Sequence, residues 1–165
     1  KWVKTVPSIM SDHQYEGFSR AAREVIKTAQ KGVDMEIVGG AVYSFSRQAS
    51  NCVFPDGSWG VEGFKRNTFS RAGQIFFKDD VKQALSNLGS LEKYSCKFAR
   101  IIREILEHKK EACFVFDEMV SGGGVILFSM ILKLYGFVQM KKLAKIENME
   151  EKNRFSKPNH YPYPN

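Results

Sequence analysis

The most restrictive feature of the sequence is the stretch ACFVFDEMVSGGGVILFSMILKLYG, residues 112–136, in which two apolar runs flank a turn of glycines. The first run, ACFVF, is uninterrupted and predicts a strand that is covered on both faces. The second run predicts a helix that ends at Gly136. A helix precedes this stretch, and FVQMKKLAKI after it can form one more strand. The order helix, strand, helix, strand predicts an α/β fold whose parallel sheet is flanked by helices.

Three helices in all are expected before this stretch. The segment SDHQYEGFSRAAREVIKTAQKG predicts a helix that Ser11 or Asp12 caps and Gly32 ends. Its apolar residues follow three- and four-residue steps, as one buried stripe requires: Tyr15, Phe18, Ala22, Val25 and Ala29. DDVKQALSNLGS predicts a short helix with a glycine stop, and YSCKFARIIREILEHKKEA predicts a longer one capped by Ser95.

Residues 39–78 differ from the rest, since they are rich in Gly, Ser, Asn and Pro and predict a long irregular loop region. This region interleaves polar and cationic residues with aromatic ones: Arg47, Gln48, Asn51, Lys65 and Arg66 with Phe54, Trp59 and Phe64. Such a mixture suits a nucleic-acid surface, but it is also typical of a loop that its aromatic residues pin to the core. The tail, residues 147–165, is charged and then proline-rich, which predicts an exposed loop or linker.

These patterns divide the chain into four segments. They are an entry segment with a helix at 1–38, a loop insertion at 39–78, an α/β lobe core at 79–146 and the tail at 147–165. The formal net charge of +7 favours a polyanionic partner, above all nucleic acid. The three cysteines are widely spaced, with no CxxC, which predicts reduced thiols of an intracellular protein, no metal site, and Cys113 within the buried strand. No segment is apolar for long enough to predict a membrane span.

The glycine turn suggests two uses. The amides of Gly123, Gly124 and Val125, at the positive end of the helix dipole, can hold a phosphate, and Ser121 can add its hydroxyl. The alternative is a turn that only lets strand and helix pack closely. The sequence has no GxxxxGK[ST] motif and no pairing of His with Ser or Cys, so no catalytic residue is expected.

Three segments, in order and at similar spacing, resemble the second RecA-like lobe of superfamily-2 helicases of large DNA viruses. The type most similar is the poxvirus and asfarvirus early-transcription-factor or nucleoside-triphosphatase type. The segments are MSDHQYEGF, SRQASNCVFP and LEKYSCKFARIIREILEHKKEACFVFDEMVSGGGVILFSMILKLYGF. Asp117 and Glu118 stand where this family commonly has serine and asparagine, which argues against direct phosphate contact by these two residues.

The resemblance implies a partial RecA-like lobe, whose glycine turn corresponds to helicase motif IV and faces the nucleic-acid backbone. The residues that it and the nearby charges nominate for nucleic-acid binding are Ser121, Gly122, Gly123, Gly124, Arg47, Gln48, Lys65 and Arg66. It also implies a virion and host-cell cytoplasmic location, no membrane association, and two partners besides DNA or RNA: the first helicase lobe and the viral RNA polymerase.

The activity that the resemblance implies is ATP-dependent helicase or translocase action in viral early transcription. ATP and Mg²⁺ are expected for the full-length parent and no cofactor for this segment, because the sequence carries neither a Walker lysine nor an arginine-rich motif. The isolated chain is therefore expected to be inactive. The alternative is a non-catalytic basic subunit that binds nucleic acid or serves as a docking surface within a virion or transcription complex.

Overall fold

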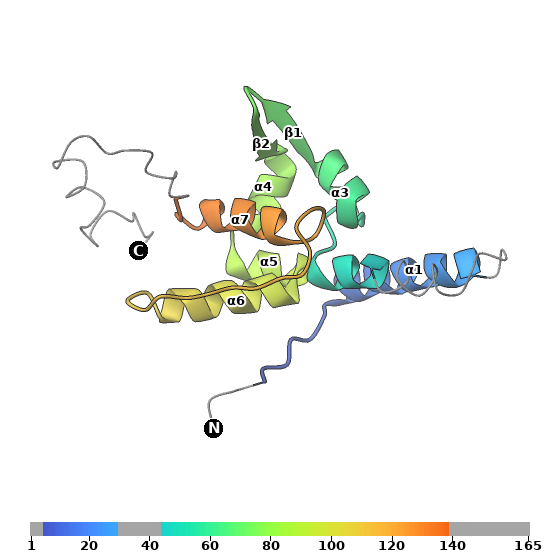
Figure 1. Cartoon of the computed structure of the whole chain (residues 1–165), viewed down its shortest axis with the longest axis horizontal. Helices are drawn as coiled ribbons and strands as arrows, with labels where there is room; N and C mark the ends of the chain where they lie inside the picture. The colour runs from blue at the N-terminus through green and yellow to red at the C-terminus, as the bar shows by residue number, and fades with distance from the viewer. Residues whose placement is uncertain (1–4, 30–43, 139–165) are drawn as a thin grey trace.

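The computed structural model describes residues 5–29 and 44–138 as a mainly helical body from which one β-hairpin protrudes (Figure 1). A helix without a label spans residues 44–51. The labelled elements, in chain order, are α1 (Asp12–Ala29), α3 (Gly60–Asn67), β1 (Thr68–Arg71), β2 (Gln74–Phe77), α4 (Asp79–Leu85), α5 (Leu88–Tyr94), α6 (Cys96–Glu107) and α7 (Val125–Leu134). The expected glycine stop at Gly32, most of the expected strand FVQMKKLAKI and the tail at 147–165 lie outside the described residues.

The fold mixes helices with a small sheet, and in the described ranges that sheet is one antiparallel pair, β1 with β2. No parallel sheet is present there. The ACFVF run is extended but pairs with no strand of the described chain, and Phe114 and Phe116 are 90% and 76% exposed. The prediction of a strand covered on both faces is therefore wrong for this part of the chain, and so is the burial of Cys113, which is exposed.

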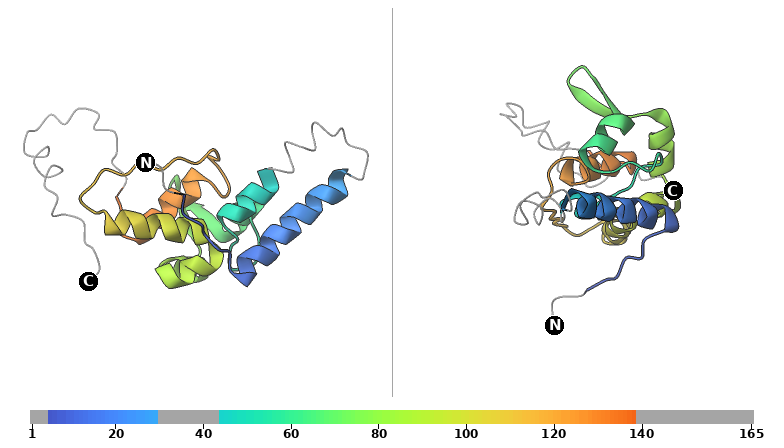
Figure 2. Two further views of the ribbon diagram at one scale, coloured as in Figure 1. Left: turned by 90° about the horizontal axis from the view of Figure 1, so that it is seen from below. Right: turned by 90° about the vertical axis from the view of Figure 1, so that its right-hand side faces the viewer.

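One hydrophobic cluster holds most of the body together. It joins α4, α5, α6 and α7 to residues 52–54 and to the last residue of β2, and its largest fully buried side chains are Phe54, Leu85, Leu91, Ile102, Leu127 and Ile131. A smaller cluster, formed by Ala21, Ala49 and Val53, packs α1 against the helix at residues 44–51, and the two helices lie side by side (Figure 2). Because Val53 follows Cys52 of the large cluster, both clusters stabilise one body.

Residues 44–78 are ordered, so the prediction of an irregular loop there is wrong. They form the helix at 44–51, then α3 and the β-hairpin. Phe54 is completely buried, while Trp59 and Phe64 pack against the two clusters. The aromatic residues thus attach this region to the core. This agrees with the alternative to a nucleic-acid surface that the sequence suggested. The segment boundaries at 38, 78 and 146 stay predictions.

The helix predictions were confirmed with two corrections. α6 begins after Ser95, whose Oγ accepts a hydrogen bond from the Phe98 amide at 3.2 Å, and α1 begins after Ser11, whose Oγ accepts from the Gln14 amide at 3.1 Å. The predicted stripe of α1 is wrong at Tyr15, which is 61% exposed, whereas Phe18 packs against the small cluster as predicted. The buried positions of that turn are Gln14 and Gly17. The glycine stop predicted for the helix DDVKQALSNLGS is wrong too, because α4 ends at Leu85 and Gly89 lies within α5.

Candidate nucleic-acid interface

The glycine turn lies where three segments approach each other most closely. A Cβ on Gly122 would lie 2.8 Å from the Val61 nitrogen and 2.8 Å from the Gln48 Oε1, and one on Gly123 would lie 2.9 Å from the Gln48 carbonyl oxygen. A Cβ on Gly60 would also meet the Gln48 Oε1, at 2.5 Å. The turn, the helix at 44–51 and the start of α3 therefore pack backbone against backbone around Gln48, and this close approach requires glycine.

The amides at the start of α7 are less available than the sequence suggested. The Val125 amide donates to the Met119 carbonyl at 2.8 Å, and the Ile126 amide donates to the Val120 carbonyl at 3.1 Å. The prediction that Val125 offers its amide to a phosphate is therefore wrong. Ser121 is exposed and Gly122, Gly123 and Gly124 are buried, so a nucleic-acid strand would meet the serine first.

A polar junction, formed by Gln14, Asn51, Ser95, Lys97 and Asp117, lies beside this turn. Gln14 is completely buried; its Nε2 donates to the Ser50 carbonyl at 3.0 Å, and its Oε1 accepts from the Cys96 amide at 3.0 Å. Asn51 Nδ2 donates to Asp117 Oδ2 at 2.8 Å, and Lys97 Nζ approaches Asn51 Oδ1 at 3.4 Å. Buried polar side chains that are satisfied in this way fix one arrangement of the segments that carry them.

The charges beside the polar junction are balanced. Arg47 forms an ion pair with Glu118 at 2.6 Å, and both side chains are more than half exposed. Asp117 and Lys97 add one charge of each sign around the same cleft of about 310 Å³. A phosphate at this place would have to displace Glu118 from Arg47. Of the residues nominated from sequence, Arg47 is therefore available to an anion only in competition with that carboxylate.

A second cleft, of about 520 Å³, brings Gln48 together with Arg66 of α3 and Arg20 of α1, and three carboxylates line it as well: Glu24, Asp56 and Glu62. The Arg20 guanidinium lies 5.5 Å from the Trp59 ring centroid and donates to the Gly57 carbonyl at 2.7 Å. Lys65 pairs with Glu62 of its own helix at 3.2 Å, an exposed pair worth little to stability. The structure thus joins Gln48 to the glycine turn and to Arg66, and it places Arg47 on the separate cleft beside the polar junction.

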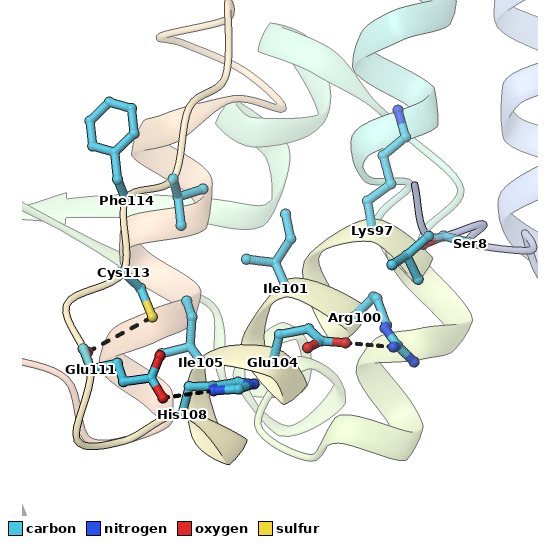
Figure 3. Close-up of a pocket in the computed structure, with 12 residues that line it drawn as sticks. Ser8, Lys97, Arg100, Ile101, Glu104, Ile105, His108, Glu111, Cys113 and Phe114 are labelled. Carbon is cyan, nitrogen blue, oxygen red and sulfur yellow. Dashed lines mark hydrogen bonds and ion pairs between the residues drawn. The ribbon is translucent and has the colours of Figure 1, made fainter. Parts of the chain in front are cut away.

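A larger groove of about 680 Å³ lies between α6 and the extended residues 113–115 (Figure 3). Ile101 and Ile105 of α6 line it. Four of its polar residues form two pairs, Arg100 with Glu104 and His108 with Glu111, and Lys97 lines it as well. The groove therefore has a mixed lining of apolar and charged side chains.

The described ranges contain two buried cysteines, Cys52 and Cys96. These ranges contain no group of three or more His, Cys, Asp or Glu side chains able to hold a metal ion. Burial raises the pKa of Cys52 to about 12 and also raises the pKa of Cys96, so both thiols are protonated and poor nucleophiles at neutral pH. No helix in this part of the chain is long and apolar enough to cross a membrane.

The polar junction was missed as a unit by sequence reasoning. Its members come from four places in the chain, and Gln14, Asn51, Ser95 and Lys97 all lie in the segments that carry the family resemblance. Their signal was present as short motifs, but sequence alone did not show that these motifs meet. The segments on which the resemblance rests are adjacent in space because their polar side chains bond to one another.

Comparison with known proteins gave two similar viral proteins. Over 101 residues, or 60% of this chain, it is 34% identical to "Putative helicase 087L" of Invertebrate iridescent virus 3. Over 99 residues, or 54% of the chain, it is 28% identical to "Putative ATP-dependent RNA helicase" of Heliothis virescens ascovirus 3e. The chain is related to helicase-named proteins of large DNA viruses.

The matched region covers about 10% of the length of each relative. No family model matches the chain, and no solved structure matches it. The helicase relationship expected from sequence is thus confirmed, and the superfamily and the type of helicase stay predictions.

Proposed function

We propose that this chain is part of the second RecA-like lobe of a superfamily-2, ATP-dependent nucleic-acid helicase or translocase of a large DNA virus, acting in early transcription. The observation that carries the proposal is the meeting of the resembling segments at the polar junction, in a chain whose two relatives are named helicases. A chance similarity of short motifs gives no reason for their side chains to bond to one another.

The arrangement around residues 112–117 supports the lobe. This extended segment lies between α6 and α7 in the chain, and Val115 packs on the large cluster while Phe114 and Phe116 face outward. A central strand of a parallel sheet has the same alternation, with further strands and helices covering the outer face. The groove lined by residues 113–115 is the place for such a neighbour.

In the proposed mechanism, this lobe holds one nucleic-acid strand by its phosphate backbone. Ser121 is exposed at the turn, and Arg66, an exposed residue of α3 near Gln48, is the cation that would contact a phosphate. Phosphate contacts of this kind position a strand without reading its sequence. ATP and Mg²⁺ would be held by other parts of the whole protein, because this sequence carries no Walker lysine.

The first test is binding of the 165-residue chain to labelled single and double strands, followed by fluorescence anisotropy over a range of KCl concentrations. The variant Lys65→Gln with Arg66→Gln removes two cations of α3. The control Arg23→Gln with Lys27→Gln removes two exposed cations of α1, so both variants change the net charge equally.

We expect the α3 variant to lower the slope of log K against log salt by about 1.4 on single strands, that is, about 0.7 for each lost phosphate contact. The α1 variant should change it little. Equal effects of both variants would mean that net charge alone drives binding and would remove α3 from the interface. Absence of binding by the parent chain would overturn the proposed role.

A further inference from the structure

The β-hairpin is exposed throughout residues 69–76 and projects away from the helices (Figure 1). Its strands pair in the register Phe69 with Phe76 and Arg71 with Gln74. Both turn residues have positive φ, +50° at Ala72 and +73° at Gly73, as the tight turns of two-residue hairpins require. The hairpin is thus a regular, well-formed ribbon rather than a loop.

The two faces of this ribbon differ. Side chains alternate along a strand, so Thr68 and Phe77 share one face with Ser70 and Ile75, and Phe69 and Phe76 lie on the other. Phe77 is buried in the large cluster, and the Thr68 Oγ1 donates to the Phe64 carbonyl at 2.7 Å. The first face therefore anchors the base of the hairpin to the body.

The second face presents aromatic surface to solvent. The rings of Phe69 and Phe76 are stacked, with centroids 5.7 Å apart and planes inclined by 27°, and the residues are 47% and 41% exposed. Arg71 and Gln74 share this face, one step nearer the tip. An exposed aromatic pair next to a cation and an amide is the composition of a site that stacks bases and holds a backbone.

The charge around the hairpin favours nucleic acid over protein as the ligand. From Gly63 to Lys78 the chain has four cations and no carboxylate: Lys65, Arg66, Arg71 and Lys78. The neighbouring acids are Glu62, which pairs with Lys65, Asp56, which lies near Arg66, and the pair Asp79 and Asp80 at the start of α4. Arg71 is the last residue of β1, next to the hairpin turn, and lies between Glu62 and Asp79 in the sequence. It shares its face of the hairpin with the aromatic pair.

We propose that the face formed by Phe69, Phe76, Arg71 and Gln74 binds single-stranded nucleic acid, with an unpaired base stacked on the exposed phenylalanine pair and the strand's phosphate beside Arg71. In a duplex the faces of the bases are already stacked, so this face selects unpaired strands or open ends. The inference rests on the proposed function for the identity of the ligand, and it concerns residues outside the interface tested above.

The test uses the 165-residue chain with a labelled oligo-dT strand and a labelled duplex, measured by anisotropy at fixed KCl. The variant Phe69→Leu with Phe76→Leu keeps apolar side chains and removes the rings. We expect single-strand affinity to fall roughly 5- to 30-fold and duplex affinity to stay within a factor of about 2. Arg71→Gln should lower the single-strand salt slope by about 0.7.

The matched control is Ile75→Ala, which trims an exposed apolar residue on the opposite face, 44% exposed, and should leave both affinities unchanged. Circular dichroism melting of each variant verifies that the hairpin variants remain folded. Single-strand affinity unchanged by the leucine variant overturns the proposal while leaving the proposed function intact, and a parent chain that binds neither strand overturns both. Loss of self-association in the leucine variant, with strand binding unchanged, would assign the face to protein contact instead.

Discussion

Gly122 and Gly73 share the left-handed backbone conformation but differ in how closely other atoms pack around them. Gly122 has a φ of +67° and is packed against the backbone of Gly60 and Val61. Gly73, at the tip of the hairpin, has a φ of +73°, but a Cβ there would have no other atom within 4 Å. The left-handed conformation is unfavourable for alanine at both positions, whereas only Gly122 adds a close backbone contact.

We expect Gly122→Ala to lower the free energy of unfolding by about 2–4 kcal/mol, the sum of backbone strain and overpacking. Gly73→Ala, the matched control, should lower it by about 1 kcal/mol from strain alone. Urea denaturation of the two variants and the parent measures the difference. Equal losses would show that the glycine turn does not need its close approach to the start of α3.

Asp56 organises the turn between the helix at 44–51 and α3. Its Oδ1 accepts hydrogen bonds from the Ser58 amide at 3.0 Å and from Asn67 Nδ2 at 3.1 Å. Burial by itself raises the pKa of this carboxyl, but the hydrogen bonds from Ser58 and Asn67 and the charge of Arg66 outweigh burial and lower it below the ordinary value of 3.8. The folded state therefore prefers the ionised carboxylate.

Because the folded pKa lies below the unfolded one, this carboxylate stabilises the protein above the unfolded pKa, and the stabilisation disappears as pH falls through the folded pKa. We expect Asp56→Asn to lower the free energy of unfolding at pH 7 and to lower it progressively less between pH 4 and pH 2, in urea titrations at each pH. Ser58→Ala removes the hydrogen bond from the Ser58 hydroxyl to Asp56 Oδ1 but keeps those from the Ser58 amide and Asn67 Nδ2, so it should lower the free energy of unfolding less than Asp56→Asn does. A pH-independent difference between parent and Asp56→Asn would contradict this account.

At the scale of elements, sequence periodicity was sufficient to predict the helix α6 but insufficient to predict the helices and strands of residues 44–78. α6 has a capping serine and an apolar stripe, so local chemistry alone specifies it. In residues 44–78 the helices and strands are short and rich in small residues, and their order depends on contacts far away in sequence, such as Cys52 and Phe54 in the large cluster. Such contacts leave no periodic signal in the sequence.

The nominated site residues follow the same rule. Gln48 and the glycine turn could be named from short motifs, but their packing around one another depends on the path of α3, which the sequence did not show. The ion pair of Arg47 with Glu118 was equally hidden, since 71 positions separate the two residues in the sequence and only the fold brings them together. Sequence therefore predicted candidate residue types better than it predicted their availability to a ligand.

At the scale of the whole molecule, residues 112–117 are as apolar as an interior strand, yet they lie on the surface of the described body. Phe114 and Phe116 are almost fully exposed, while Val115 between them packs on the large cluster. Apolar patches of this kind usually mark an interaction surface. In the proposed lobe they would be covered by neighbouring strands and helices, and the relatives, of which the chain spans a tenth, have ample sequence to supply these.

This difference between neighbours gives a test of the whole arrangement. Phe114→Ser with Phe116→Ser should change the free energy of unfolding of the 165-residue chain by no more than about 0.5 kcal/mol, because exposed side chains contribute little. Val115→Ala, the control between them, should lower it by about 1–2 kcal/mol through lost burial. Urea denaturation measures both. A serine variant as destabilised as Val115→Ala would mean that the two phenylalanines are packed within this chain, and the sheet neighbour assigned to them in the proposed lobe would then be unnecessary.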